Sequence, residues 1–385
     1  MFKDAAFLTR QFRSAAMLLW FLLSPGLAAL AQSSSALTAA AEPLGPSSRR
    51  SPLIISEIMY DPPARLDGRI VEFIEIHNSQ LWPENIGGYR LSSDVDYTFP
   101  EGTMLPAEGF LVVAKVPADV QTVYGISGVL GPYSKSLSKN SGTLRLRNRQ
   151  DAILVEVNFS SKFPWPVAAA GTGHSLILAR PSYGEGNREA WAASDLKGGS
   201  PGAAETLGAE PARSVMMNEI LAHTDPPLFD FIELYNQSPQ AVDLSGCYLS
   251  DRSDTNKFRV PNGTVIAANG FVSFDETQLG FALSATGESV FLVNSNQTRV
   301  LDAVSFEGQA NGVSSGRFPN GSPGFHELAS RTPGAGMNTH DAVAPVAATA
   351  SPTSAKIGMP STSVPAFFGL VPATTCVPYS RFRRP

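Results

Sequence analysis

The stretch of sequence that decides the fold is residues 72–78, EFIEIHN, because it returns at residues 230–236 as DFIELYN. Ile74 and Ile76 fall on one face of an extended chain, and the residues between them fall on the other. β-Branched and aromatic residues that end on an Asn are typical of a strand bounded by a turn. The chain is therefore expected to contain a core-covering strand that occurs twice.

The repeat extends in both directions from this strand, in the same order and with nearly the same spacing. Six further blocks correspond: 55–59 with 217–221, 86–92 with 244–250, 99–103 with 260–264, 109–112 with 270–273, 137–146 with 283–292, and 201–203 with 333–335. Every block is short and bounded by Gly, Pro, Asn or Asp, which favours strands over helices. Short strands spaced by turns, without a long helical period, predict two all-β sandwiches of two sheets each.

The ordered blocks also resemble a known family, the lamin-tail domain, and they do so twice. The shared features are an Asn/Ser-Glu-Ile strand, a Phe-Ile-Glu strand ending in Asn, a Gly-containing turn, a Pro-x-Gly-Thr block, a Leu-Ser block and a terminal Pro-Gly-Ala. Copy one spans residues 53–204 and includes Trp165, whereas copy two spans residues 214–338 and lacks both this Trp and the stretch around 124–132. A shortened hairpin is therefore expected in copy two.

The resemblance implies an immunoglobulin-like sandwich of the kind found at the tail of nuclear lamins and in exported bacterial proteins, often beside hydrolase or nuclease domains. It implies binding or architectural modules and no catalytic residue. The fold class expected from it is all-β, with two tandem immunoglobulin-like β-sandwiches.

Composition agrees with two turn-rich domains. The chain has 385 residues, of which 43% are apolar and only 16% charged, with 33 Gly and 30 Pro. This length suits two or three domains with sizeable cores. A formal net charge of -5 gives no general attraction to nucleic acid or to an anionic membrane.

The two ends and the middle of the chain predict segments outside the sandwiches. Residues 1–31 have the order of an export signal: basic residues, an apolar run at 15–23, and small residues before a cleavage site after Ala31. The run is too short to span a bilayer, so we expect a secreted protein, extracellular or at the cell surface. Residues 32–52 are expected to form a disordered leader, 205–213 a protease-sensitive linker, and 339–385 a low-complexity tail.

Cysteine usage predicts no disulfide framework. Cys247 lies in a strand-like block and Cys376 in the Pro/Thr-rich tail, and no others occur. Whether these two cysteines pair is left open. No cofactor is predicted, because the five His and two Cys show no zinc-ligand spacing.

Aromatic and basic residues supply the candidate binding positions. Three tryptophans, Trp82, Trp165 and Trp191, would stack on sugars or peptides if exposed. Trp165 is the one selected, because a proline on each side suits an edge segment; a core position is the alternative. Arg145, Arg147 and Arg149 alternate and can share one strand face that meets phosphate, with a solvated face as the alternative.

Acidic residues are interpreted as structural. Asp94, Asp96, Asp251 and Asp254 follow corresponding strand ends and are weak candidates for calcium, but no spacing matches a calcium loop, and Asp is a standard turn residue. No metal site is predicted.

Two duplicated carboxylate pairs invite an acid/base reading. They are Glu57 with Glu75 and Glu219 with Glu233. Because each pair recurs within strand blocks of both copies, we expect structural pairing rather than catalysis. His174 beside Ser175 does not form a Gly-x-Ser-x-Gly elbow either.

The expected function is that of a secreted, non-catalytic binding or adhesion protein, or an architectural one, presenting two lamin-tail-type modules. The alternative is an accessory or truncated part of a larger extracellular enzyme, a nuclease or hydrolase, whose catalytic domain is absent from this chain. The partner is unknown: an extracellular protein, a polysaccharide or an anionic polymer would each fit. Binding is expected through copy one, which has the longer insert at 116–136.

Overall fold

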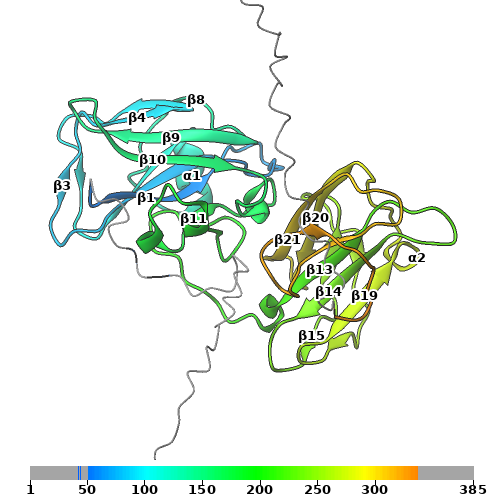
Figure 1. The fold of residues 1–385 in the computed structure, drawn as a ribbon. Coiled ribbons are helices and arrows are strands. Elements are labelled where there is room, and N and C mark those ends of the chain that lie inside the picture. The colour runs from blue at the N-terminus through cyan, green and yellow to red at the C-terminus, as the bar shows by residue number, and fades with distance from the viewer. Residues whose placement is uncertain (1–41, 43, 45–50, 337–385) are drawn as a thin grey trace, which may run out of the picture. The chain divides into compact units, whose positions relative to one another are not determined.

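The computed structural model describes residues 42, 44 and 51–336, which contain both repeats (Figure 1). The predicted export signal, nearly all of the leader, and the tail with Cys376 lie outside the described residues. In the part of the chain that is described, no helix is long and apolar enough to cross a membrane.

Copy one consists of two five-stranded antiparallel sheets. In the order β12-β11-β1-β2-β7, the first sheet contains β12 (Trp191–Ala193), β11 (Leu176–Leu178), β1 (Leu53–Met59), β2 (Phe73–Asn78) and β7 (Phe110–Ala114). In the order β10-β9-β4-β5-β8, the second contains β10 (Ile153–Ser160), β9 (Ser141–Arg147), β4 (Arg90–Ser93), β5 (Val95–Thr98) and β8 (Ser134–Lys135). A short pair, β3 (Glu84–Asn85) and β6 (Met104–Leu105), closes one end.

Copy two repeats this plan with shorter edges. Its larger sheet contains β19 (Phe271–Asp275), β14 (Phe231–Asn236), β13 (Val215–Leu221), β22 (Ser315–Gly316) and β23 (His326–Glu327), in that order. The facing sheet contains β17 (Phe258–Arg259), β16 (Tyr248–Ser250), β20 (Gly287–Val293) and β21 (Val300–Glu307), in that order. The short pair is β15 (Val242–Asp243) with β18 (Val265–Ile266).

Each sandwich has its own apolar core. In copy one, Ile74 and Ile76 of β2 are fully buried together with Leu144 and Leu146 of the facing strand β9. Copy two buries Ile232 and the other corresponding residues in the same way. The alternation seen in the sequence therefore builds both cores, and the prediction of two tandem immunoglobulin-like β-sandwiches is confirmed.

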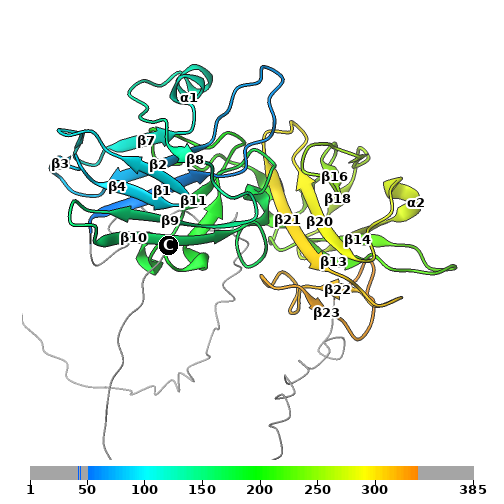
Figure 2. The same ribbon diagram turned by 90° about the horizontal axis from the view of Figure 1, so that it is seen from above.

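The longer insert of copy one forms a helix that covers the outer side of the first sheet. Helix α1 (Pro117–Tyr124) begins with a proline, whose missing N–H costs nothing in the first turn, and ends at Gly125 in the left-handed conformation. Val120 packs against Phe73 of β2 in a separate apolar cluster. Figure 2 shows α1 beside β7, on the side away from β9 and β10. Copy two has only the four-residue helix α2 (Glu276–Leu279) at this point.

Four 3-10 turns complete the described structure. They are η1 (Val167–Ala169), η2 (Pro181–Tyr183), η3 (Arg188–Ala190) and η4 (Pro211–Ser214). Within the predicted linker, residues 206–209 are exposed, while Glu205 and Glu210 on either side of them are partly buried.

Candidate functional site

The duplicated glutamates hold the segment that closes each sandwich. Glu57 and Glu75 lie opposite each other on β1 and β2, next to a β-bulge, and both are 1% exposed. Glu57 accepts a hydrogen bond from the N–H of Ser200 at 3.0 Å, and Glu75 accepts from the N–H of Gly202 at 2.6 Å. The Pro-Gly-Ala block at the end of copy one is therefore tied to the central strands.

Copy two has the same arrangement, which we call the glutamate clamp in both copies. Glu219 and Glu233 lie opposite each other on β13 and β14, again beside a bulge. Glu219 accepts from the N–H of Thr332 at 3.0 Å, and Glu233 from the N–H of Gly334 at 2.8 Å. In both copies the carboxylate oxygens bind the chain's own backbone, which is a structural use.

Burial raises the pKa of Glu57, Glu75 and Glu233. Desolvation raises the pKa of Glu75 to about 8 and that of Glu233 to about 7, and it raises the pKa of Glu57 well above its ordinary value. The nearby Glu75 raises the pKa of Glu57 further, because two charges on adjacent strands repel.

Of the three candidate tryptophans, Trp82 lies at the surface. Trp165 is 9% exposed, belongs to the core cluster, and its ring lies 6.1 Å from that of Trp191, centroid to centroid. Trp191 is 1% exposed, whereas Trp82 is 59% exposed. Trp165 therefore occupies the core position that was the alternative to an exposed edge.

Arg145 and Arg147 lie on β9 and Arg149 lies just beyond its end. Each of the three side chains bonds to other groups of copy one. Arg145 forms an ion pair with Glu156 at 2.5 Å, and the Nε of Arg147 donates to the hydroxyl of Ser92 at 3.0 Å. Arg149, beyond the end of the strand, donates to a backbone carbonyl. A phosphate ligand would have to compete with these internal partners.

The four aspartates lie in two separate turns. Asp94 accepts from two backbone N–H groups, and Asp96 is exposed. In copy two, Asp251 pairs with Lys257 at 2.6 Å, and Asp254 pairs with Arg252 of its own turn. Across the described ranges, no three or more His, Cys, Asp or Glu side chains gather in a way that would hold a metal ion.

Residues of the two copies also pack against each other along a line that we call the seam. Its apolar part is formed by Val167, Ala168 and Ala193 of copy one and Phe291, Val293 and Val300 of copy two. The side chains from copy two belong to β20 and β21.

His174 is a polar contact of the seam. Its Nδ1 lies 2.8 Å from the carbonyl of Ser194, and its Nε2 accepts from the N–H of Val300 at 2.9 Å. Burial lowers the pKa of His174 to about 4, which keeps the ring neutral and able to accept this bond. The neighbouring Ser175 instead donates to Glu57, so the two side chains do not act together.

A buried ion cluster completes the seam. Asp195 of copy one pairs with Arg299 of copy two at 2.5 Å and with Arg213 of the connecting segment. Arg299 also pairs with Glu210 at 3.0 Å and is only 5% exposed. Breaking such a pair leaves an uncompensated buried charge, so the cluster favours one specific arrangement of these groups.

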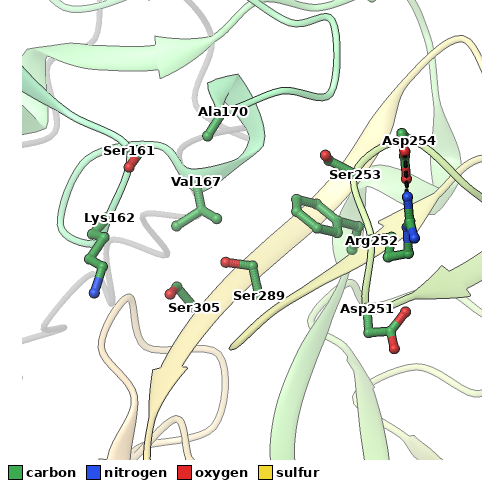
Figure 3. A pocket seen from close by; sticks show the side chains of 11 residues that line it. Ser161, Lys162, Val167, Ala170, Asp251, Arg252, Ser253, Asp254, Ser289 and Ser305 are labelled. Carbon is green, nitrogen blue, oxygen red and sulfur yellow. Dashed lines mark hydrogen bonds and ion pairs between the residues drawn. The ribbon is translucent and has the colours of Figure 1, made fainter. Parts of the chain in front are cut away.

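A cleft of about 430 Å³ lies beside the seam (Figure 3). Its walls come from both copies: Ser161 and Lys162 from copy one, and Ser289, Ser305 and residues 251–254 from copy two. The weak metal candidates Asp251 and Asp254 thus line this cleft. No local sequence pattern marks this cleft, because its two walls lie more than 80 residues apart in the chain.

The loop after β2 exposes different side chains in the two copies. In copy one the Nδ2 of Asn78 donates to the carbonyls of Trp82 and Pro106, at 2.9 and 3.0 Å. In copy two the corresponding Asn236 donates to the carbonyls of Gln240 and Ala267. The two loops are therefore held in the same way but carry different side chains at their tips.

The family model of the lamin tail domain matches residues 46–159 and 209–308 of the chain. These two regions contain most of each sandwich and together cover more than half of the 385 residues. The search of curated proteins found no match for this chain. With the sandwich order, the repeated clamp and the two matched regions in agreement, the chain belongs to the lamin tail domain family.

Proposed function

We propose that the chain is an exported, non-catalytic binding protein and that copy one carries its recognition loop at residues 79–83. The observation behind this proposal is the comparison of the two loops held by Asn78 and Asn236. Leu81 is 77% exposed and Trp82 is 59% exposed, while copy two has Pro239 and Gln240 at these places. Copy two folds on the same scaffold without apolar tips, so the fold does not require them.

Exposed apolar side chains at a loop tip suit recognition. A single exposed leucine on a protein surface is ordinary. Here two large apolar residues are adjacent on one loop, and the same asparagine hydrogen bonds hold this loop in both copies. Together they form a small rigid contact surface. Tryptophan contributes much contact area for little loss of conformational entropy, which is why it is common in binding hot spots. Recognition by copy one is thus supported at Trp82 rather than at Trp165.

A non-catalytic role is supported by how the structure uses its best chemical candidates. Both glutamate pairs bind backbone N–H groups, and His174 binds a backbone N–H across the seam. Export is supported by the order of residues 1–31 alone. Mass spectrometry of the secreted chain tests it, with Gln32 expected as the first residue.

The test of recognition uses the full mature chain against a panel of extracellular proteins and wall polysaccharides. We expect Trp82→Gln, which installs the residue of copy two, to weaken binding by about thirtyfold, the effect of losing a hot-spot side chain. The matched control is Leu66→Ser, because Leu66 is fully exposed on a different loop of copy one. Unchanged binding by the Trp82 variant would contradict the loop assignment, and turnover of a substrate would contradict the non-catalytic role.

A further inference from the structure

We infer that the cleft beside the seam binds a neutral saccharide unit. This inference concerns a second site and does not rest on the loop at residues 79–83. A volume of about 430 Å³ falls within the range of small-molecule sites. The cleft is built from both copies, so it would belong to the tandem chain and to neither sandwich alone.

Paired hydroxyls supply the polar contacts. Ser289 and Ser305 lie directly opposite each other on β20 and β21, so their side chains are neighbours on one face. The corresponding pair in copy one is Thr143 and Asn158, whose side chains hydrogen-bond to each other at 2.8 Å. No such bond joins the two serines in the described structure. The pair of copy two therefore presents donors and acceptors to whatever enters the cleft.

Two further hydroxyls face the same space. Ser161 of copy one and Ser253 of copy two both line the cleft, and both are half-buried. A ligand rich in hydroxyls would match this lining, because each hydroxyl both donates and accepts.

The charges around the cleft are paired, which favours a neutral ligand. Arg252 forms two hydrogen bonds to Asp254, at 2.8 and 2.7 Å. Lys257 holds Asp251 at 2.6 Å, and Lys162 lies 3.5 Å from Glu307. An anionic polymer would meet these carboxylates as well as the cations, so it would gain little from the cations.

Apolar groups complete the lining. Val167, Ala170 and Phe291 line the cleft, and only 6% of Val167 and 5% of Phe291 is exposed, so they offer a narrow apolar strip to the C–H face of a sugar ring. The combination of unpaired hydroxyls, balanced charge and an apolar patch is the chemistry of a neutral saccharide site.

The test measures binding of the full mature chain to maltose, cellobiose, mannobiose and di-N-acetylchitobiose by calorimetry and ligand-observed NMR. We expect at least one disaccharide to bind, and the double variant Ser289→Ala/Ser305→Ala to weaken it by about tenfold or more, since two hydrogen bonds are lost. The matched control is Ser273→Ala, because Ser273 is a half-buried strand serine of copy two in the other sheet.

Three outcomes would overturn the inference. The first is no binding of any neutral disaccharide, the second is equal binding by wild type and the double variant, and the third is a preference for polygalacturonate that disappears with added salt. In each case the Trp82 experiment still reports on the loop, so failure here is distinguishable from failure of the proposed function. A second variant, Ala170→Trp, fills the cleft from copy one and should abolish binding without touching a hydroxyl.

Discussion

The outer face of β9 in copy one and that of β20 in copy two occupy the same place in the repeat but carry opposite chemistry. Arg145 corresponds to Phe291, and Arg147 corresponds to Val293, when residues 137–146 are aligned with 283–292 and extended by one residue. The arginines are partly solvated, whereas the two apolar side chains are about 95% buried in the seam. One scaffold therefore carries either a partly solvated sheet face or a docked one.

The residue opposite the first of these positions, on the neighbouring strand β10 or β21, also changes from charged in copy one to apolar in copy two. Arg145 lies opposite Glu156, while Phe291 lies opposite Ala303. An ion pair across two strands suits a face in water, and a small apolar partner suits a face that is covered. The difference between the copies is thus a consistent pattern over two strands and not a single exchange.

The largest effect is expected from giving copy two the residue of copy one. Phe291→Arg places a cation in the apolar part of the seam and removes the buried ring, so we expect a loss of at least about 3 kcal/mol in the free energy of unfolding. The reciprocal Arg145→Phe should cost less than about 1 kcal/mol, because that face is half-exposed. Urea unfolding followed by circular dichroism measures both, because copy two contains no tryptophan and fluorescence would report on copy one alone.

Limited proteolysis gives a second readout of the same pair of variants. Cleavage within residues 205–213 should become faster in Phe291→Arg than in the wild type, because the ion cluster around Asp195 depends on the packed seam. Equal stabilities and equal cleavage for the two variants would show that the seam does not hold the copies together.

The repeated side chains explain how much of this could be predicted from the sequence. The alternation at Ile74 and Ile76 recurs in copy two, and it was enough to predict the strands and both cores. The reason is that burial of alternate residues is a local property of a strand. The clamp was predicted as structural pairing, but its partners at Ser200 and Gly202 are more than 120 residues away, and no local pattern gives such contacts.

The positions at the surface were harder to predict. The two prolines beside Trp165 suggested an edge, yet the ring packs near Trp191, which only the folded chain brings to it. A signal for the seam was present in the aligned repeat, as Phe291 in the place of Arg145. This exchange indicates that the sheet face of copy two is buried. It does not indicate which segment buries it, and in the structure that segment is η1 of copy one.

A somewhat smaller effect is expected at the glutamate clamp. Glu57→Met and Glu219→Met each leave buried N–H groups without an acceptor, so each should cost about 1–3 kcal/mol. Because the closing segments are held by matching bonds, the two losses should agree within about 1 kcal/mol. Unfolding of single variants in urea measures them. A large loss at only one position would mean that the clamp is essential in one copy and incidental in the other.

The pH dependence of stability separates the two clamps further. The pKa of Glu75 is about 8 and that of Glu233 about 7, both above the ordinary value of 4.5. A raised pKa in the folded state means that protonation favours folding, so this stabilisation is complete below about pH 4.5 and is lost as the pH rises through the folded pKa. The decline should therefore run from about pH 4.5 to about pH 7 for the carboxyl of copy two and to about pH 8 for that of copy one, and stability should level off above these values.

Melting temperatures across this range test the assignment. Glu75→Gln and Glu233→Gln should each flatten the decline that its own carboxyl causes, because an amide does not titrate. Stability that rises between about pH 5 and about pH 9, or a decline that both Gln variants leave intact, would contradict the protonated clamp.

The smallest effect is expected on removal of divalent metal, which compares the Asp94 turn of copy one with the Asp251 turn of copy two. Calcium prefers six to eight oxygen ligands, and across the described residues neither turn gathers three or more His, Cys, Asp or Glu side chains that could hold it. Asp94 accepts from backbone N–H groups, Asp251 binds Lys257, and an ammonium group next to a carboxylate opposes cation binding. Thermal melts with and without a chelator should therefore coincide. A drop in melting temperature that calcium restores, and that Asp251→Asn abolishes but Asp94→Asn does not, would place a metal in the turn of copy two and would make the cleft beside the seam a metal-dependent site.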